Sequence, residues 1–534
     1  MTSLKRATAF MTLGTLLSRV TGLARITAIA AALGIAEKGS VADTFNLANT
    51  APTIIYELIL GGILTSVFVP VFVELVEKEG RERAWEVASA LINLSLVILV
   101  AITVIGIATA PLIAKFYTLN VEGDRLAEQR EALTFLLRLF IPQIIFYGLT
   151  ALTAGLLNAH KRFGAPMYTP VLNNLGVIAV FLSFWAAYGR VTLETVSTGQ
   201  LLVIGLGTTA GVALMAVAQI PFLRGLGRYR FTLRNGGTSV RKLARLSLFV
   251  IGYAVANQVG YTIVQVLAAG QAGAYAAYFT AFIFFMLPHG LFAVSIITAL
   301  LPGMSSFAVK EDWVSFRSNL STGIRTTLLL ILPAAVGYMV LGEPIVRLIL
   351  EHGNSTALST DLVVDVLRFF VIGLVPFSLF QLFLRAFYAL QDPKTPFLVN
   401  CVAVAFNVAI DFPLFAAFGV EGLAAGHAAS YIFGVIVLGL LLQRRIGGMD
   451  ARRIIHSGWR IGASAALMGL TVLGVYRAID DRLDSDRLIG QLAEVFVPVA
   501  VGAASYAAFT ILFRVEETSA IKNVLRGRFG REDR

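Results

Sequence analysis

Residues 8–34 read TAFMTLGTLLSRVTGLARITAIAAALG, an apolar stretch that carries two arginines, Arg19 and Arg25. A helix that spans a membrane needs about 20 mainly apolar residues, and this stretch is long enough. The apolar part of a secretory signal peptide is short and carries no charge, so the two arginines argue against cleavage. We therefore predict that residues 8–34 form a retained first transmembrane helix.

The rest of the chain has the same apolar character. Of its 534 residues, 57% are hydrophobic and 14% are charged, and the mean hydropathy is +0.79. Soluble domains have roughly 45–50% apolar and 25% charged residues, so this chain has too few polar side chains for a water-facing surface. Read with a spanning window, the sequence gives about 14 apolar segments. It predicts an all-α polytopic membrane protein.

Basic residues predict the orientation of the helices. Their densest clusters lie within 224–245, 444–460 and 514–534, which fall on one side of the membrane when the predicted spans alternate. Cytoplasmic loops are enriched in Lys and Arg, so both termini are predicted to be cytoplasmic, in the plasma membrane of a bacterium. The net charge of +11 then reflects topology and contact with anionic lipid headgroups, and not binding to nucleic acid.

An internal repeat predicts the domain organisation. The turns 158–166 (NAHKRFGAP) and 388–396 (YALQDPKTP) are both short, polar and closed by proline, and 230 residues separate them. The simplest account is a pair of six-helix lobes, 1–225 and 226–445, followed by two further helices and a cytoplasmic tail in 446–534. Repeats of this kind indicate alternating access around a site between the lobes.

The first helix predicts an anionic substrate. A charge in the membrane core is costly and marks a function or a pairing need. Arg19 and Arg25 lie about 120° apart on an ideal helix, and Gly22 between them would permit a bend toward one cavity. A guanidinium is always charged and matches phosphate oxygens. The alternative is that the arginines reach the interface or pair with Asp43 or Glu57.

Two further pairs suggest gating and ion coupling. Glu57 and His289 occupy corresponding positions in the repeat and would form a pH-sensitive gate, although a lone histidine is more often a satisfied core residue. Asn407 and Asp411 are four residues apart and share one helix face. They would bind Na⁺ or relay H⁺; the alternative is a single hydrogen bond between helices.

The sequence gives no sign of an enzyme. Cys401 is the only cysteine, so no internal disulfide forms, and the five histidines have no metal-ligand spacing. No phosphate-binding loop or nucleophile–base motif is present. We expect a transporter without a cofactor.

Several motifs together resemble one family over essentially the whole chain. They are Ser18–Arg25 (SRVTGLAR), Ala42–Phe45 (ADTF), Gly155–Phe163 (GLLNAHKRF), Pro170–Leu175 (PVLNNL) and Phe387–Pro396 (FYALQDPKTP). This set is similar to the MurJ/MviN family of lipid II flippases, in the multidrug/oligosaccharidyl-lipid/polysaccharide exporter superfamily.

The resemblance implies a fourteen-helix fold with a V-shaped central cavity. The substrate would be lipid II, the undecaprenyl-pyrophosphate-linked precursor of peptidoglycan, with membrane lipids and cell-wall synthesis proteins as further partners. Arg19 and Arg25 would hold the pyrophosphate, and Asn407 and Asp411 would bind sodium. The last two helices would form a groove for the isoprenoid tail. Three more residues match cavity or gate positions of the family: Ser18, Asp43 and Asn174.

The chain departs from the family pattern at three places. Thr50 and Tyr56 stand where basic residues are expected in the second helix, with Glu57 nearby. Ile26 stands where an aspartate often follows the second arginine, and Phe282–Phe284 (FIF) stand where many members have an arginine in the eighth helix. Alternatives to a lipid II flippase are therefore kept open. They are a flippase for another polyprenyl-linked glycan, a cation-coupled drug exporter, and a cell-wall scaffold without transport.

Overall fold

A computed structural model describes residues 2–518 apart from 38, 57–79, 124, 161, 228, 230, 232–237 and 483–486. The part of the chain that the structure describes is 85% helical and contains no strand. This agrees with the predicted all-α membrane protein. Eleven helices of the described part are long and apolar enough to cross a membrane, or twelve if the bent pair α13 and α14 counts as one span. The number fourteen stays a prediction.

The chain folds into two compact units. The first consists of residues 1–276 and 349–359, and the second of residues 277–348 and 360–534. The first contains α1 (Thr2–Leu33), α2 (Ala42–Tyr56), α4 (Arg81–Tyr117), α5 (Arg125–Phe140), α6 (Gln143–Ala159), α7 (Gly164–Tyr188), α8 (Thr198–Val217), the 3₁₀ turn η3 (Ile220–Leu223) and α9 (Thr238–Ala269). By its sequence position, α9 belongs to the predicted second lobe, 226–445.

The second unit contains most of α10 (Ala274–Pro288), the π-helical turn η4 (His289–Ala293), α11 (Val294–Val309), nearly all of α12 (Trp313–Leu350), the greater part of α13 (Ala357–Ile372), and α14 (Leu374–Ala389). It continues with α15 (Lys394–Phe418), α16 (Val420–Arg445), α17 (Ala451–Asp480) and α18 (Leu488–Leu512).

Helix lengths repeat along the chain. The helices α7 and α15 both have 25 residues and begin 230 residues apart, each within one of the two matching turns. Each ends at a glycine, Gly189 with a φ of 63° and Gly419 with a φ of 62°, a left-handed conformation that favours glycine at a helix end. The helices α5 and α13 likewise both have 16 residues. The repeat predicted from the turns therefore extends to the helices.

In the first unit, α1 packs along α7. A Cβ at Gly14 would lie 2.9 Å from the ring of Tyr168, so the helices approach closely because a side chain is missing there. Phe45 of α2 packs edge-on against Phe140 and Phe181. The close contact with α7 positions α1, the helix that bears the two arginines, and the Phe45 contacts join α2 to α5 and α7.

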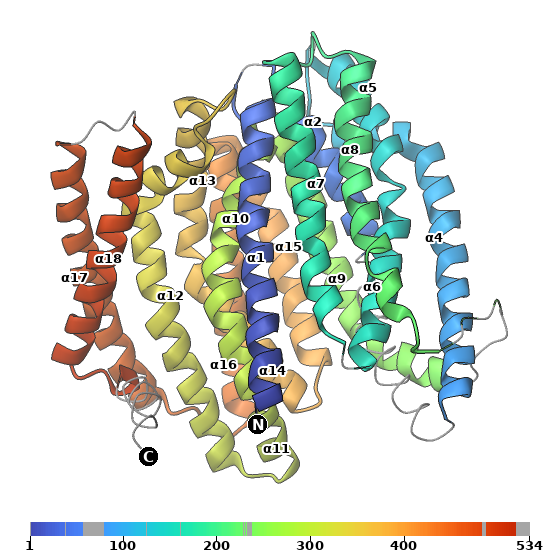
Figure 1. Cartoon of the computed structure of the whole chain (residues 1–534). Helices are drawn as coiled ribbons and strands as arrows, with labels where there is room; N and C mark the ends of the chain where they lie inside the picture. The colour runs from blue at the N-terminus through green and yellow to red at the C-terminus, as the bar shows by residue number, and fades with distance from the viewer. Residues whose placement is uncertain are drawn as a thin grey trace. The chain divides into compact units, whose positions relative to one another are not determined.

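In the second unit, α17 and α18 form an antiparallel hairpin (Figure 1). Leu329 of α12 clusters with Ile461 and Val515, and the Tyr506 hydroxyl donates to the main-chain oxygen of Leu329 at 2.8 Å. The hairpin is therefore packed against α12.

Candidate functional site

The arginine-bearing turn of α1 is held by α7. Asn174 Nδ2 donates to the main-chain oxygen of Ser18 at 3.2 Å and to Thr21 Oγ1 at 3.0 Å. Arg19 is exposed and Ser18 is half-buried. Among the predicted substrate residues, the structure thus brings Ser18, Arg19 and Asn174 together on neighbouring turns. Asn174 uses its amide to position α1.

Arg25 lies in a polar group made by three helices. Its Nε is buried and forms no hydrogen bond with any described residue. The hydroxyl of Tyr147 in α6 lies near enough to interact with it electrostatically and is hydrogen-bonded to Thr53 of α2. The rings of Tyr147 and Tyr56 are 5.9 Å apart. Sequence reasoning missed Tyr147, because a tyrosine in an apolar run looks like an ordinary core residue.

Neither arginine has an acidic partner within the described part of the chain. Asp43, one of the two partners considered from the sequence, pairs with Arg125 at 3.4 Å instead. The other, Glu57, lies outside the described residues. A guanidinium in a membrane helix without a neutralising carboxylate is suited to an anionic ligand.

Asp43 ties helix ends together. One carboxylate oxygen accepts a hydrogen bond from the main-chain N–H of Gly273 at 2.6 Å, and the other accepts one from Ala276 at 2.9 Å. These N–H groups belong to the start of α10, where helices leave donors unpaired. Both oxygens of Asp43 are therefore bound by protein groups.

His289 is buried in the second unit. Its Nδ1 lies 3.0 Å from Ser378 Oγ, and its ring centroid is 4.6 Å from that of Phe377. It begins the π-helical turn directly after Pro288, and such turns often mark functional sites. Because Glu57 lies outside the described residues, the predicted gating pair stays a prediction.

Asn407 and Asp411 lie on one face of α15, as predicted. Asn407 Nδ2 donates to Asp411 Oδ1 at 2.9 Å. Asp411 is fully buried, and its Oδ2 has no hydrogen-bond partner among the described residues. The same holds for Nε2 of His427, whose ring packs on Phe282, Phe285 and Phe370. The described residues contain no cluster of three or more metal-ligating side chains.

Comparison with known proteins identifies the family to which the chain belongs. The family model of the lipid II flippase MurJ matches residues 29–483. The chain belongs to the MurJ family of lipid II flippases. It is accordingly a multi-pass transporter of the inner membrane and not an enzyme, as the sequence predicted.

Individual relatives match along most of their length. A probable MurJ of Thermotoga maritima is 28% identical over 98% of this chain and 99% of its own. A probable MurJ of Rhizobium meliloti is 29% identical over 82% of this chain and 80% of its own. A solved MurJ structure in an inward closed conformation has a TM-score of 0.75 at 22% identity and covers 94% of this chain and 98% of its own. The chain therefore has the fold of this MurJ structure over nearly its whole length.

Proposed function

We propose that this MurJ family member moves lipid II from the inner to the outer leaflet by alternating access, with Arg19 and Arg25 holding the pyrophosphate. The observation that carries the assignment is the buried Nε of Arg25, which has neither a hydrogen bond nor an acidic partner in the described part of the chain. Pyrophosphate oxygens would satisfy this donor, and the planar guanidinium fork matches their geometry.

The other predicted site residues have supporting roles in this proposal. Asn174 and Ser18 hold the turn of α1 that presents Arg19. Asp43 secures the opposite end of the same unit through Gly273 and Ala276. Glu57 and His289 would act as a gate, and the hairpin of α17 and α18 would accept the isoprenoid tail.

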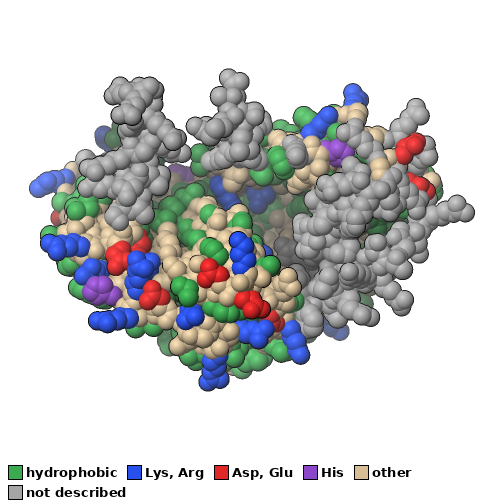
Figure 2. Space-filling view, turned by 90° about the horizontal axis from the view of Figure 1, so that it is seen from below, with side chains coloured by type: hydrophobic (Ala, Val, Ile, Leu, Met, Phe, Trp, Pro, Cys, Tyr) green, Lys and Arg blue, Asp and Glu red, His purple; other side chains and the backbone are tan. Residues whose placement is uncertain are grey.

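Exposed basic residues support the proposed orientation in the membrane. One end of the second unit carries five exposed arginines on α16, on α17 and after α18: Arg444, Arg445, Arg452, Arg453 and Arg514. Figure 2 views the molecule from this end, where Lys and Arg side chains are numerous. The proposal places this end and both termini in the cytoplasm. It also divides the transporter into two lobes, residues 1–225 and 226–445. Residues 446–534 then form two further helices and a cytoplasmic tail.

Ion coupling is the second part of the proposal. The free Oδ2 of Asp411 is a hard oxygen donor in a buried position, which suits Na⁺ or a proton. Movement of one charge through 100 mV is worth about 2.3 kcal/mol, enough to bias an unloaded cationic cavity.

Complementation of a flippase-depleted bacterium tests the proposal. Outer-leaflet lipid II would be assayed for the wild type, Arg19→Ala, Arg25→Ala and the control Arg368→Ala, whose side chain is 50% exposed and paired with Asp365. The wild type and the control should restore lipid II exposure, and the two α1 variants should not, at equal membrane levels. A wild type that inserts but leaves lipid II inside would favour another polyprenyl-linked glycan as substrate.

A further inference from the structure

Residues 349–359 belong to the first compact unit, although the chain on both sides of them belongs to the second. This segment joins α12 to α13, most of whose residues belong to the second unit. It lies beside the loop between α1 and α2, at the end of α1 opposite the N-terminus. It is bound there by hydrogen bonds to the α1–α2 loop and to the last turn of α1.

The carboxylate of Glu37 is the centre of these contacts. Glu37 is 6% exposed and accepts hydrogen bonds from the main-chain N–H of Ile35 at 2.6 Å and of Thr356 at 2.7 Å. The hydroxyls of Thr356 and Ser359 lie 3.0 Å and 2.8 Å from its oxygens. Ser359 Oγ also accepts from the main-chain N–H of Ala36 at 3.0 Å. All these donors are uncharged.

The same segment closes the end of α1. The Asn354 main-chain N–H donates to the Ala31 oxygen at 2.8 Å, and its Nδ2 donates to the Ala32 oxygen at 2.8 Å. These are carbonyls that a helix end leaves without an internal partner. A Cβ at Gly353 would lie 2.6 Å from the Ala31 oxygen, and Gly353 has a φ of 62°. Only glycine fits this approach.

The repeat contains a matching contact. The loop between α4 and α5 corresponds to 349–359, and its Asn120 donates through Nδ2 to the Leu267 oxygen near the end of α9 at 3.1 Å. Arg125, the first residue of α5, donates to the main-chain oxygen of Ala269 at the end of α9 at 3.2 Å. Each repeat therefore caps the first helix of the other through an asparagine. The carboxylate of Glu37 is an addition to this shared arrangement.

We propose that Glu37 and residues 349–359 form a latch that closes the outer end of the transporter and is released once in each transport cycle. The inference rests on the proposed alternating access and cytoplasmic termini. Because the segment leads directly into α12 on one side and α13 on the other, a displacement of these helices pulls it off Glu37. Water replaces uncharged donors to a carboxylate readily, so the latch opens into solvent without leaving a buried charge unpaired.

Thiol labelling measures opening without any substrate. Ala31 is 5% exposed beneath Gly353 and Asn354, and in a Cys401→Ala background Ala31→Cys would provide a single reporter. A membrane-impermeant reagent added outside should label it slowly. Glu37→Gln and Ser359→Ala should each raise the rate by at least about tenfold, because loss of even one hydrogen bond to a charged group changes an equilibrium by about that factor. Thr195→Ala, in the adjacent α7–α8 loop, is the control and should not change it.

Cross-linking tests whether the latch has to open. Ala36→Cys with Ser359→Cys, also in the Cys401→Ala background, would bridge the latch. Oxidation should stop lipid II flipping and a reductant should restore it. The control pair Ser40→Cys with Thr192→Cys joins two loops of the first unit that already form a β-bridge, and it should flip lipid II in both states.

The two readouts separate the latch from the proposed substrate. Unchanged labelling in both Glu37→Gln and Ser359→Ala, or undiminished flipping with the latch fully cross-linked, overturns the latch. Failure of the unmodified protein to flip lipid II in the same cells overturns the proposed function, and the labelling rates still decide the latch.

Discussion

Asp411 Oδ1 contacts Gly426 so closely that no Cβ fits at residue 426. The carboxylate on α15 thus lies directly against the backbone of α16, and a side chain as small as alanine would displace it. This contact makes Gly426 part of the candidate ion site.

Gly426→Ala should therefore destabilise the protein by about 1–3 kcal/mol, the usual cost of overpacking. Thermal unfolding in detergent would measure this. Gly337→Ala in α12 is the control, since a Cβ there would meet nothing within 4 Å. A control as unstable as Gly426→Ala would show that detergent unfolding does not report this contact.

Sodium should stabilise the wild type through Asp411. A ligand that binds only the folded state at 100 times its Kd adds about 2.7 kcal/mol, so the unfolding temperature should be higher in NaCl than in choline chloride. Asp411→Asn should abolish this difference, and Asp365→Asn, whose side chain is 48% exposed, should keep it. An equal sodium effect in Asp411→Asn would place the cation elsewhere.

The repeat was readable from the sequence because turns carry specific residues. The matching turns predicted an internal repeat, and in the structure α7 and α15 have equal lengths and each ends at a glycine. The arginines of α1 were readable because charge is rare in an apolar run. Tyr147 and Gly426 were not, since their importance comes from neighbours on other helices. Glu37 looked like an ordinary loop residue, because only the fold brings Ser359 to it.

Asp43 matched a cavity position of the family, yet the structure binds both of its oxygens to protein donors. Asp43→Asn removes the negative charge that pairs with Arg125 and accepts hydrogen bonds from the main-chain N–H groups of Gly273 and Ala276. Hydrogen bonds to a charged group contribute about 1.5–3 kcal/mol each, so the unfolding free energy should fall by at least about 2 kcal/mol. Chemical denaturation would test this. If Asp43 instead contacts substrate, stability would hold and lipid II binding would fall.

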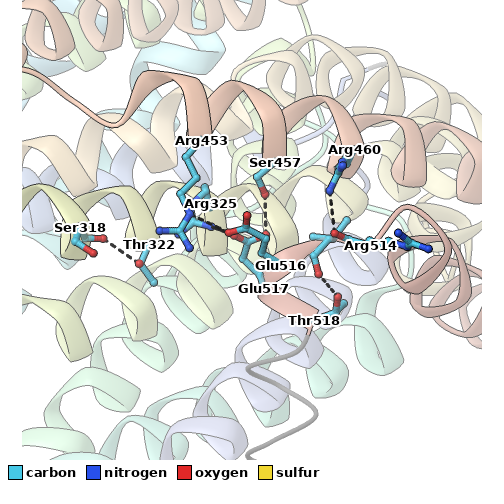
Figure 3. A network of polar contacts seen from close by, with 11 residues as sticks. Ser318, Thr322, Arg325, Arg453, Ser457, Arg460, Arg514, Glu516, Glu517 and Thr518 are labelled. Carbon is cyan, nitrogen blue, oxygen red and sulfur yellow. Dashed lines mark hydrogen bonds and ion pairs between the residues drawn. The ribbon is translucent and has the colours of Figure 1, made fainter.

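A buried ion pair joins α12 to the segment after α18. Arg325 and Glu517 are 5% and 6% exposed and form a salt bridge, and Glu517 also accepts from Ser457 of α17 at 2.7 Å (Figure 3). Glu517→Ala would leave Arg325 buried without its nearest partner, which costs about 3–5 kcal/mol. The neighbouring Glu516 is 46% exposed, so Glu516→Ala should cost only about 0–1 kcal/mol. Unfolding of both variants in detergent compares the two, and equal losses would contradict this account.

The Arg453–Glu516 pair should make the docking of this segment sensitive to acid. The hydrogen bond from Arg453 Nε, at 2.9 Å, lowers the pKa of the Glu516 carboxyl below its ordinary value of 4.5 (Figure 3). A carboxyl with a lowered folded-state pKa stabilises the fold above its unfolded pKa, and this stability is lost as the pH falls through the folded pKa. The unfolding temperature should therefore fall as the pH drops below about 4.5, and Glu516→Gln should show a smaller decrease. Glu343→Gln, on a carboxyl 41% exposed in α12, is the matched control and should keep the full decrease. Identical pH profiles for the wild type and Glu516→Gln would show that other carboxyls account for the acid sensitivity.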